Sequence, residues 1–504
     1  MKQRIMNFIL ATTFLAFIPS CTSDPYTPVS GLDIEKKVTL RIAIPTISDK
    51  GLSAVTNSFC KKYPNVNFKI DYVENYSSAA DSMIKANELD IMFERGKKYS
   101  ESEMENTDDY YYDFYNDEEI DLSSTTDDLT GNYTYSRTEN EKTINNLYSI
   151  PVGGEVRGIY VNTSFLKSLN LSVPKTWTEF NTVCAAIKKA GYYPIQGNPS
   201  SAGVGLFTAD TVSQVVNDSE KLEKFRKAEA GSSELFRSSI EKLYSLGTNR
   251  YYDYQSVEEL GQFKSATEIA QVYSFLGLTL NTETFLYEKP ANNIGNVAFF
   301  PYYSSVGPNS ISYLLNQYDM ETEYTFIPTP TSDDGNNPLY LTPYYGICAN
   351  KHSSNLVWIR EFVNYFMSEK INKLYAQESG IIPNSKDAIS YMAEKYSVNK
   401  KSCIVCGTIN FSETYNGFTP IQSVLTDASK CSAKKYMPKL NKDENGNITY
   451  LLDTDGKEYL TNDKKQIIYK EYVGQEDPLL PGYAFCTVDY YMNIFENKLA
   501  NYRS

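Results

Sequence analysis

Apolar and polar residues follow two different periods along the first ninety residues. Residues 37–45 and 66–73 alternate at every second position, which predicts two strands, and residues 90–93 form a third, short buried strand. Residues 51–63 and 79–86 carry apolar side chains every three or four positions, which predicts helices. The alternation of strand and helix favours βαβ units and a largely parallel sheet.

A second block of structure is predicted to begin at residue 151. Residues 158–161 form an apolar strand that turns at Asn162, and a short helix follows. Residues 174–177 end that helix and cap the next one, which Gly191 closes. One face of this second helix carries apolar residues at helical spacing: Phe180, Val183, Cys184 and Ile187. This pattern is typical of a two-lobed protein whose chain crosses a hinge near residue 151.

The rest of the chain is predicted to cross between the lobes twice more. With 504 residues the chain is too long for one core. We expect a return crossing at 324–330 and a further crossing near 380–383. The first lobe then comprises 37–150 plus 330–378, and the second comprises 151–329 plus 379–504. Two glycine turns, at Gly446 and Gly456, predict a β-hairpin insertion near 441–468. We see no internal repeat.

The N-terminus is predicted to be a secretory signal. Lys2 and Arg4 precede an apolar run over 8–18, and Ser20 and Cys21 follow. This arrangement resembles the bacterial lipoprotein signal, in which the cysteine becomes the lipid-modified N-terminus. A plain signal-peptidase substrate is the alternative. Residues 22–36 would then be a polar tether, and a lipid on Cys21 would be the membrane anchor.

Charge narrows the range of partners. The formal net charge is −14, which argues against a nucleic-acid partner. The stretch 94–145 is rich in Asp and Tyr, and it could be a tyrosine-lined sugar site or a solvated acidic insertion. We expect the insertion.

The cysteines do not predict a metal site, and one disulfide among them is possible. Seven cysteines remain after Cys21, an odd number. Cys60 and Cys184 lie on predicted core faces, so we expect them to be free. A single CxxC, with His352 far away, does not predict a zinc site. One disulfide is possible among the last four: Cys403, Cys406, Cys431 and Cys486.

Four local signatures, in order along the chain, carry a family resemblance. They are Asp49-Lys50-Gly51 with Phe59-Cys-Lys-Lys-Tyr-Pro64, then Leu89-Asp-Ile-Met-Phe93, then the 146–195 crossing with Pro174-Lys-Thr-Trp177, and finally Gly295-Asn-Val-Ala-Phe299 leading to Gly380-Ile-Ile-Pro383. Over residues 37–425 the chain resembles carbohydrate-type extracellular solute-binding proteins, the ligand-capturing components of ABC importers. The resemblance implies an α/β, two-lobed type II binding-protein fold. Each lobe would be a mixed, mainly parallel sheet flanked by helices, with a ligand cleft at the hinge.

The same resemblance implies a set of sugar-binding residues. Glu155 takes the place of a hinge carboxylate that accepts hydrogen bonds from sugar hydroxyls, and Tyr302 takes the place of a stacking aromatic. The chain has only two Trp, at positions assigned to packing, so further tyrosines would supply stacking. The full set is Asp49, Lys50, Glu94, Arg95, Glu155, Tyr302, Tyr303, Tyr344 and Tyr345. Helix caps or surface ion pairs are the alternative for the first four, and packing is the alternative for the tyrosines.

The leading hypothesis is a membrane-anchored sugar-binding protein on the outer face of the cell membrane. It would close its lobes around a carbohydrate and deliver it to the permease subunits of an ABC importer, acting as a monomer without cofactor, metal or catalytic residues. One alternative is a glycosidase built on Glu94 and Glu155. The other is a surface lipoprotein of the same fold that acts as a sensor or adhesin.

Overall fold

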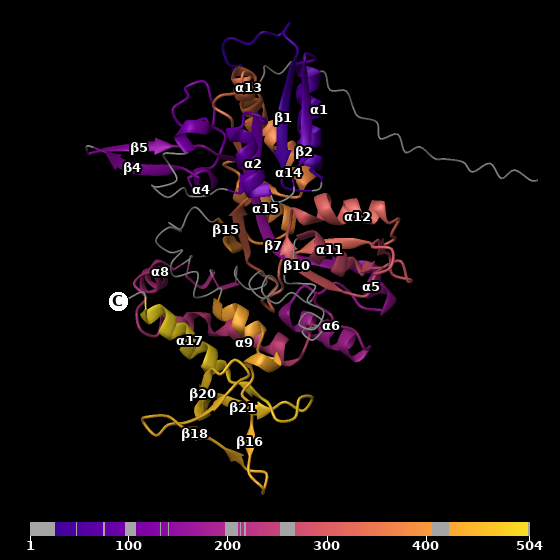
Figure 1. Cartoon of the computed structure of the whole chain (residues 1–504), viewed down its shortest axis with the longest axis vertical. Helices are drawn as coiled ribbons and strands as arrows, with labels where there is room; N and C mark the ends of the chain where they lie inside the picture. Colours follow the sequence, from indigo (N-terminus) through magenta and orange to yellow (C-terminus); the bar gives the residue numbers. More distant parts are fainter. Residues whose placement is uncertain are drawn as a thin grey trace, which may run out of the picture.

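The chain folds around two β-sheets that lie one above the other (Figure 1). The computed structural model describes residues 26–501 except 47, 74–75, 96–106, 132, 140, 197–209, 212, 216–217, 253–267 and 406–422. Cys21 and Cys406 therefore lie outside the described residues. The expected α/β fold with two lobes is confirmed.

The first sheet has the strand order β2-β1-β3-β13-β6. Its β1, β2 and β3 run parallel, as the βαβ pattern predicts, whereas β13 is antiparallel to both β3 and β6. The strands are β1 (Val38–Ile44), β2 (Val66–Tyr72), β3 (Ile91–Arg95), β6 (Ile150–Pro151) and β13 (Tyr345–Ala349).

Helices of the first lobe come from both halves of the chain. The apolar face of α1 packs on α13 and α14, where Phe59 meets Phe362 edge to face at 5.3 Å between ring centroids. Trp358 is 4% exposed in the same core, which confirms its packing role. The elements are α1 (Lys50–Lys62), α2 (Tyr76–Lys85), α4 (Asp127–Thr130), α13 (Leu356–Met367), α14 (Glu369–Ser379) and the hairpin β4 (Tyr135–Glu139) and β5 (Lys142–Asn146).

The second sheet is built around the long strand β7 (Gly153–Asn162). Four strands pair with β7, and all of them are antiparallel to it. The expectation of a mainly parallel sheet is therefore wrong for this lobe. The physical reason is that β7 leads away from the hinge, so β10, β11 and β12, which run back toward it, lie antiparallel to β7. The partners are β10 (Phe299–Tyr303), β11 (Tyr324–Ile327), β12 (Leu339–Pro343) and β14 (Ile382–Pro383); β15 (Cys403–Val405) extends the sheet beside β12.

The helices of the second lobe cover this sheet. The predicted apolar face of α6 is confirmed, since Phe180, Val183, Cys184 and Ile187 are all buried there. The elements are α5 (Thr163–Ser168), α6 (Trp177–Lys189), α8 (Ser219–Arg226), η1 (Ser232–Phe236), α9 (Arg237–Thr248), α11 (Glu268–Leu276), β8 (Thr279–Leu280), β9 (Tyr287–Glu288), η2 (Gly307–Ile311), α12 (Ser312–Gln317), α15 (Ala388–Tyr396) and η3 (Lys400–Ser402).

Three segments cross between the sheets side by side and form the hinge. The β6–β7 segment lies in the middle, with the β12–β13 link beside it and β14 paired to the start of β7. The Tyr344 N–H donates to the Gly153 carbonyl at 2.8 Å, and the Val152 N–H donates to the Tyr345 carbonyl at 3.1 Å. The predicted crossing at 324–330 is wrong, because β11 and β12 both pair with β7. By sheet membership, residues 330–343 belong to the second lobe and the chain crosses at 343–345.

The C-terminal part forms a β-module, residues 437–486, below the second lobe in Figure 1. Three of its loops repeat one turn: the first residue (Asp443, Asp453 or Asn462) accepts hydrogen bonds from the N–H groups two and four residues later. The three loops share this turn although their sequences differ. The elements are η5 (Lys434–Tyr436), β16 (Asn441–Lys442), β17 (Ile448–Thr449), β18 (Leu451–Leu452), β19 (Glu458–Thr461), β20 (Ile467–Tyr469), η6 (Lys470–Tyr472), β21 (Val473–Glu476), β22 (Ala484–Cys486) and the final helix α17 (Val488–Ala500), which packs on α9.

Two segments that were expected to be solvated are packed instead. In the acidic stretch, Tyr111 and Phe114 are 4% and 1% exposed, and the Tyr112 N–H donates to the Ala349 carbonyl. In the predicted tether, Tyr26 and Val29 are 8% and 4% exposed against the first lobe. Both segments bury a few apolar groups among many polar ones, so their composition concealed the contacts.

The described cysteines are all free, which confirms the expectation for Cys60 and Cys184. Cys403, Cys431 and Cys486 therefore form no disulfide with each other in the structure. Among the described helices, we find none that combines the length and the apolar character needed to span a bilayer.

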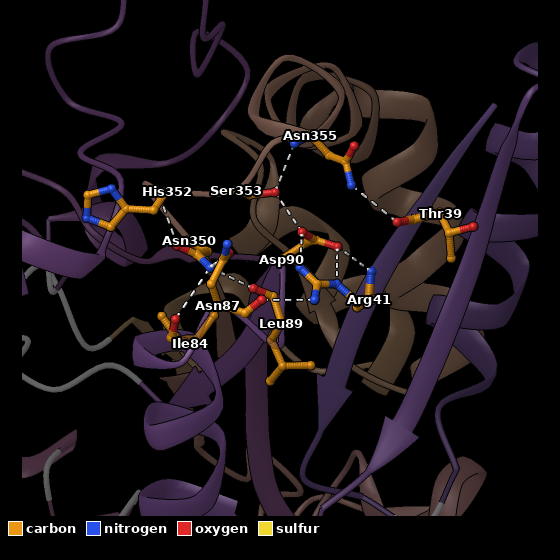
Figure 2. Close-up of polar contacts among 10 residues, drawn as sticks. All are labelled: Thr39, Arg41, Ile84, Asn87, Leu89, Asp90, Asn350, His352, Ser353 and Asn355. Atoms are coloured by element: carbon orange, nitrogen blue, oxygen red, sulfur yellow. Dashed lines mark hydrogen bonds and ion pairs between the residues drawn. The ribbon is translucent and has the colours of Figure 1, made fainter. Parts of the chain in front are cut away.

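A buried carboxylate ties together the end of the first sheet that lies away from the hinge. Asp90 is 0% exposed and accepts hydrogen bonds from Arg41 N (2.8 Å), Arg41 Nε (3.0 Å) and Ser353 Oγ (2.6 Å) (Figure 2). Burial alone would raise the pKa of Asp90, but these hydrogen bonds outweigh it, so the pKa lies below its ordinary value. Asn350, on the same loop as Ser353, donates to the carbonyl of Leu89 at 2.8 Å. The network joins β1, β3 and the loop before α13.

We predict that Asp90→Asn lowers the free energy of unfolding by about 2 kcal/mol at neutral pH, because it removes the buried, charged partner of Arg41, whose own side chain is partly exposed. Since the pKa of Asp90 is lowered on folding, its stabilisation is present at neutral pH and is lost as the pH falls below the ordinary aspartate value. Urea unfolding at several pH values measures this. Asp71→Asn is the control, because Asp71 pairs with Lys69 on the exposed surface. Equal effects of the two substitutions would contradict the assignment.

The hinge yields a second prediction. A Cβ at Gly153 would lie 2.4 Å from the Ile382 carbonyl oxygen, whereas a Cβ at Gly154 would meet the Leu341 side chain, at 2.6 Å. A leucine tip can move aside, but a paired backbone carbonyl cannot. We therefore expect Gly153→Ala to destabilise by about 1–3 kcal/mol and Gly154→Ala to cost less. Thermal unfolding of both variants checks the order, and a milder effect at Gly153 would refute the close crossing.

Candidate functional site

Glu155 lies at the hinge, two residues into β7. Its side chain is 0% exposed, and its Oε2 accepts a hydrogen bond from Ser305 Oγ at 2.6 Å. The backbone of Glu155 pairs with Thr342 on β12, so the carboxylate is held directly beside the second crossing. Ser305, which follows the predicted tyrosine pair at 302–303, was not predicted as a site residue.

Asp49 lies in the first lobe and caps the N-terminus of α1. Its Oδ1 accepts from the Leu52 N–H at 2.8 Å, and its Oδ2 accepts from Tyr375 Oη at 3.0 Å. Burial raises the pKa of Asp49, and the hydrogen bonds from Leu52, Tyr375 and Ser379 only partly offset it. The helix-cap alternative left open by the sequence therefore describes its local role. Lys50, the next residue, is exposed at the start of α1.

Tyr344 lies near both of these carboxylates. Its ring is 1% exposed, and its pKa is raised first by burial and then by nearby Tyr375, Asp49, Tyr345 and Glu155. The structure thus brings Asp49 from the first lobe and Glu155 from the second near one residue in the crossing. The ring of Tyr345 packs edge to face on Tyr344 at 4.7 Å between centroids, and it is partly exposed. Of the two, Tyr345 offers the ring that a ligand can reach.

Glu94 lies near the end of β3, close to the same crossing. It is 9% exposed, and its charge contributes to the raised pKa values of Tyr76 and Cys348, behind burial in each case. Tyr76, which sequence reasoning did not single out, donates to the Ala43 carbonyl at 2.9 Å and accepts from the Phe93 N–H at 2.8 Å. The backbone of Arg95 pairs with Tyr345; its side chain lies outside the described part.

Tyr302 and Tyr303 have partners within the second lobe. The Tyr302 ring stacks on Phe300 at 5.0 Å, and the Arg157 guanidinium lies 4.0 Å from the centre of the Tyr303 ring and bonds its hydroxyl. These contacts match the packing alternative. No sequence pattern predicts the Arg157 contact, because the contact depends on the pairing of β10 with β7.

The lobes also touch beside the hinge. Ser48 Oγ, in the loop before α1, donates to the Asn309 carbonyl on η2 at 2.7 Å. Among the described residues, no group of His, Cys, Asp and Glu is arranged to hold a metal ion. The site is therefore a set of carboxylates, hydroxyls and tyrosine rings drawn from both lobes, which suits hydrogen bonding to a polyhydroxylated ligand.

Solved structures share this architecture. The chain is similar to a manno-oligosaccharide-specific solute-binding protein, BlMnBP2, from Bifidobacterium animalis subsp. lactis in complex with mannotriose, with 17% identity over 93% of this chain and 95% of that one and a TM-score of 0.52. It is also similar to a protein from a study of xylan utilization by Caldanaerobius polysaccharolyticus, with 13% identity over 79% of this chain and 98% of that one and a TM-score of 0.50. At these identities the likeness shows the fold, and it confirms the two-lobed type II architecture.

Sequence comparison identifies the family. A comparison with curated proteins gives no match. The family described as bacterial extracellular solute-binding protein matches residues 44–373, which run from the end of β1 to within α14 and include the first two crossings; the third, at 379–383, follows the match. This match covers more than half of the chain, so the chain belongs to the family of bacterial extracellular solute-binding proteins.

Proposed function

We propose that the protein binds a sugar or oligosaccharide where its two lobes meet and delivers it to an ABC importer. The observation that carries the proposal is the convergence of Asp49, Glu155 and Tyr345 on one crossing. Ionised carboxylates make short, strong hydrogen bonds to hydroxyl groups, and a tyrosine ring covers the C–H face of a pyranose. Glu155 and Tyr345 are the residues we assign to ligand contact first.

The comparisons support the ligand class. The similar protein from Bifidobacterium was solved in complex with mannotriose, and the one from Caldanaerobius comes from a study of xylan utilization, so manno- and xylo-oligosaccharides are the first ligands to test. The family is one of binding proteins, and we propose no catalytic role for Glu94 or Glu155.

Lobe closure and anchoring complete the proposal. Ligand contacts that exist only when the lobes meet would favour the closed state, and the three crossings at 150–154, 343–345 and 379–383 would bend. Lipidation of Cys21 would keep the protein on the outer face of the membrane, beside the permease subunits.

The β-module supports a second candidate, a surface sensor or adhesin of the same fold. The module lies beyond the family match, and it exposes Leu451 (47%), Leu452 (66%) and Leu479 (69%). Exposed apolar side chains gathered on one small unit mark a surface that can contact another molecule. The two candidates differ in whether the protein binds free sugar.

A thermal-shift screen with manno- and xylo-oligosaccharides tests the first candidate. Ligand at a hundred times its dissociation constant should stabilise the protein by about 2.7 kcal/mol. We expect Glu155→Gln and Tyr345→Ala to weaken binding by about 10- to 100-fold, as measured by calorimetry, because each removes a strong contact. Tyr72→Ala is the control, since this tyrosine of the first lobe is 54% exposed. A folded protein that binds no sugar would favour the sensor or adhesin.

Substitution of Asp49 tests whether its carboxylate only caps α1 or also contacts the ligand. Because its pKa is raised on folding, the folded protein holds this proton more tightly, and stability from Asp49 falls as pH rises from the ordinary to the raised value. Asparagine caps helices as well as aspartate, so Asp49→Asn should fold normally and lose that pH dependence, whereas Asp49→Ala should cost about 1 kcal/mol or more. Unfolding curves at pH values from about 4 to 8 measure both effects. Sugar binding lost in a normally folded Asp49→Asn would instead assign this carboxylate to the ligand.

A further inference from the structure

The N-terminal strap, residues 26–30, is fastened to the first lobe by a buried glutamate. Glu361 on α13 is 0% exposed, and its Oε1 accepts from Tyr26 Oη at 2.7 Å and from Tyr63 Oη at 2.5 Å. Its Oε2 accepts from the Val29 N–H at 3.0 Å. A buried carboxylate is costly unless it is hydrogen-bonded. Two of these three donors come from the strap, so undocking the strap would leave the Glu361 carboxylate without two of its hydrogen bonds.

A cation strengthens the same contact. Lys62, at the end of α1, donates to Tyr26 Oη at 2.8 Å, and its ammonium lies 4.5 Å from the centre of the Tyr26 ring. The Tyr26 ring also meets Tyr365 edge to face at 6.3 Å. Tyr26 is therefore enclosed by α1 and α13 and is not a solvated tether residue.

A second acidic group holds the other end of the strap. The Ser30 N–H donates to Glu119 Oε1 at 3.0 Å, and Glu119 Oε2 bonds Arg360 Nη2 at 2.7 Å. Arg360 precedes Glu361 on α13 and also bonds Asp117 at 2.6 Å. Both fastenings therefore converge on one helix of the first lobe.

The docked strap limits how far the first lobe can lie from an anchor at Cys21. Had residues 22–36 formed a free tether, the fifteen residues could have spanned roughly 50 Å, whereas the five residue steps from Cys21 to Tyr26 reach at most about 18 Å. In Figure 1, α1 and α13 lie at one end of the long axis, and β16 and β18 lie at the opposite end.

We propose that the strap holds the α1–α13 end of the first lobe against the membrane surface and leaves the β-module as the part farthest from it. The partner of this face is the lipid surface itself, reached through the anchor. The inference rests on the lipid anchor of the proposed function, but it is independent of the identity of the sugar. It assigns the residues around Glu361 a positioning role.

The docked strap is tested first, without any membrane. In hydrogen exchange on the chain that starts at Cys21, the Val29 amide should be protected. Tyr26→Phe with Val29→Pro removes both strap donors to Glu361 and should abolish protection of the neighbouring residues 26–31, while Thr27→Ala, at an exposed position between them, should not. Exchange of the wild-type Val29 amide at the rate of an unstructured peptide would overturn the proposal.

The membrane position is tested with the lipidated full chain on phosphatidylglycerol-containing vesicles. Energy transfer to a lipid dye is measured from a label at Ile34→Cys, beside the strap, or at Leu452→Cys, on the β-module; both positions are exposed. We expect strong transfer from the first label and weak transfer from the second, and a smaller difference when Tyr26→Phe and Val29→Pro are added. Equal transfer in the parent protein would overturn the proposal.

The outcomes separate this inference from the proposed function. A chain that does not bind vesicles would refute the anchor and with it the membrane position, whether or not the Val29 amide is protected. The thermal-shift response to sugars would be unaffected by that result. Conversely, a chain that binds no sugar but shows the expected transfer would retain the strap and lose the proposed ligand.

Discussion

The backbone hydrogen bonds that join the three crossing segments are the constraint on which the rest of the structure depends. Two backbone hydrogen bonds join the first and second crossings: Tyr344 N–H to the Gly153 carbonyl, and Val152 N–H to the Tyr345 carbonyl. The third crossing is joined to the first because β14 pairs with the start of β7. Asn372 and Asn384 donate side-chain hydrogen bonds, each at 2.8 Å, to the carbonyls of Val152 and Pro151. These bonds satisfy polar groups of the middle crossing. They also keep its backbone in register with both sheets.

This close crossing explains why the candidate site lies where it does. Residues that end a strand of one sheet or begin a strand of the other are necessarily neighbours at the hinge. Glu155 directly follows the crossing, and Tyr345 begins β13, so the backbone register alone fixes their spacing. Asp49 reaches the same place through the cap of α1, where Tyr375 on α14 holds it. Bending at the hinge would move these side chains relative to each other, which couples ligand contact to lobe closure.

Local periodicity in the sequence was sufficient for elements whose burial depends on one face. The buried face of α6 follows directly from the spacing of Phe180 and Ile187, and the cap of α1 follows from Asp49. The predictions that were wrong or missing depend on the pairing of strands far apart in the sequence. β12 could be assigned to either sheet until its register with β7 was known, and the partner of Tyr303 is Arg157 only because β10 lies beside β7. The strap was missed for a related reason, since Glu361 is 335 residues away from Tyr26.

A sugar held between the lobes should draw them together about the three crossings. Small-angle X-ray scattering of the protein, alone and saturated with the oligosaccharide that gives the largest thermal shift, tests it most directly. We expect a smaller radius of gyration in the complex, and a larger change for the wild type than for Glu155→Gln at the same ligand concentration. A saturated complex with an unchanged radius of gyration would contradict it, because the ligand would then bind without closing the lobes.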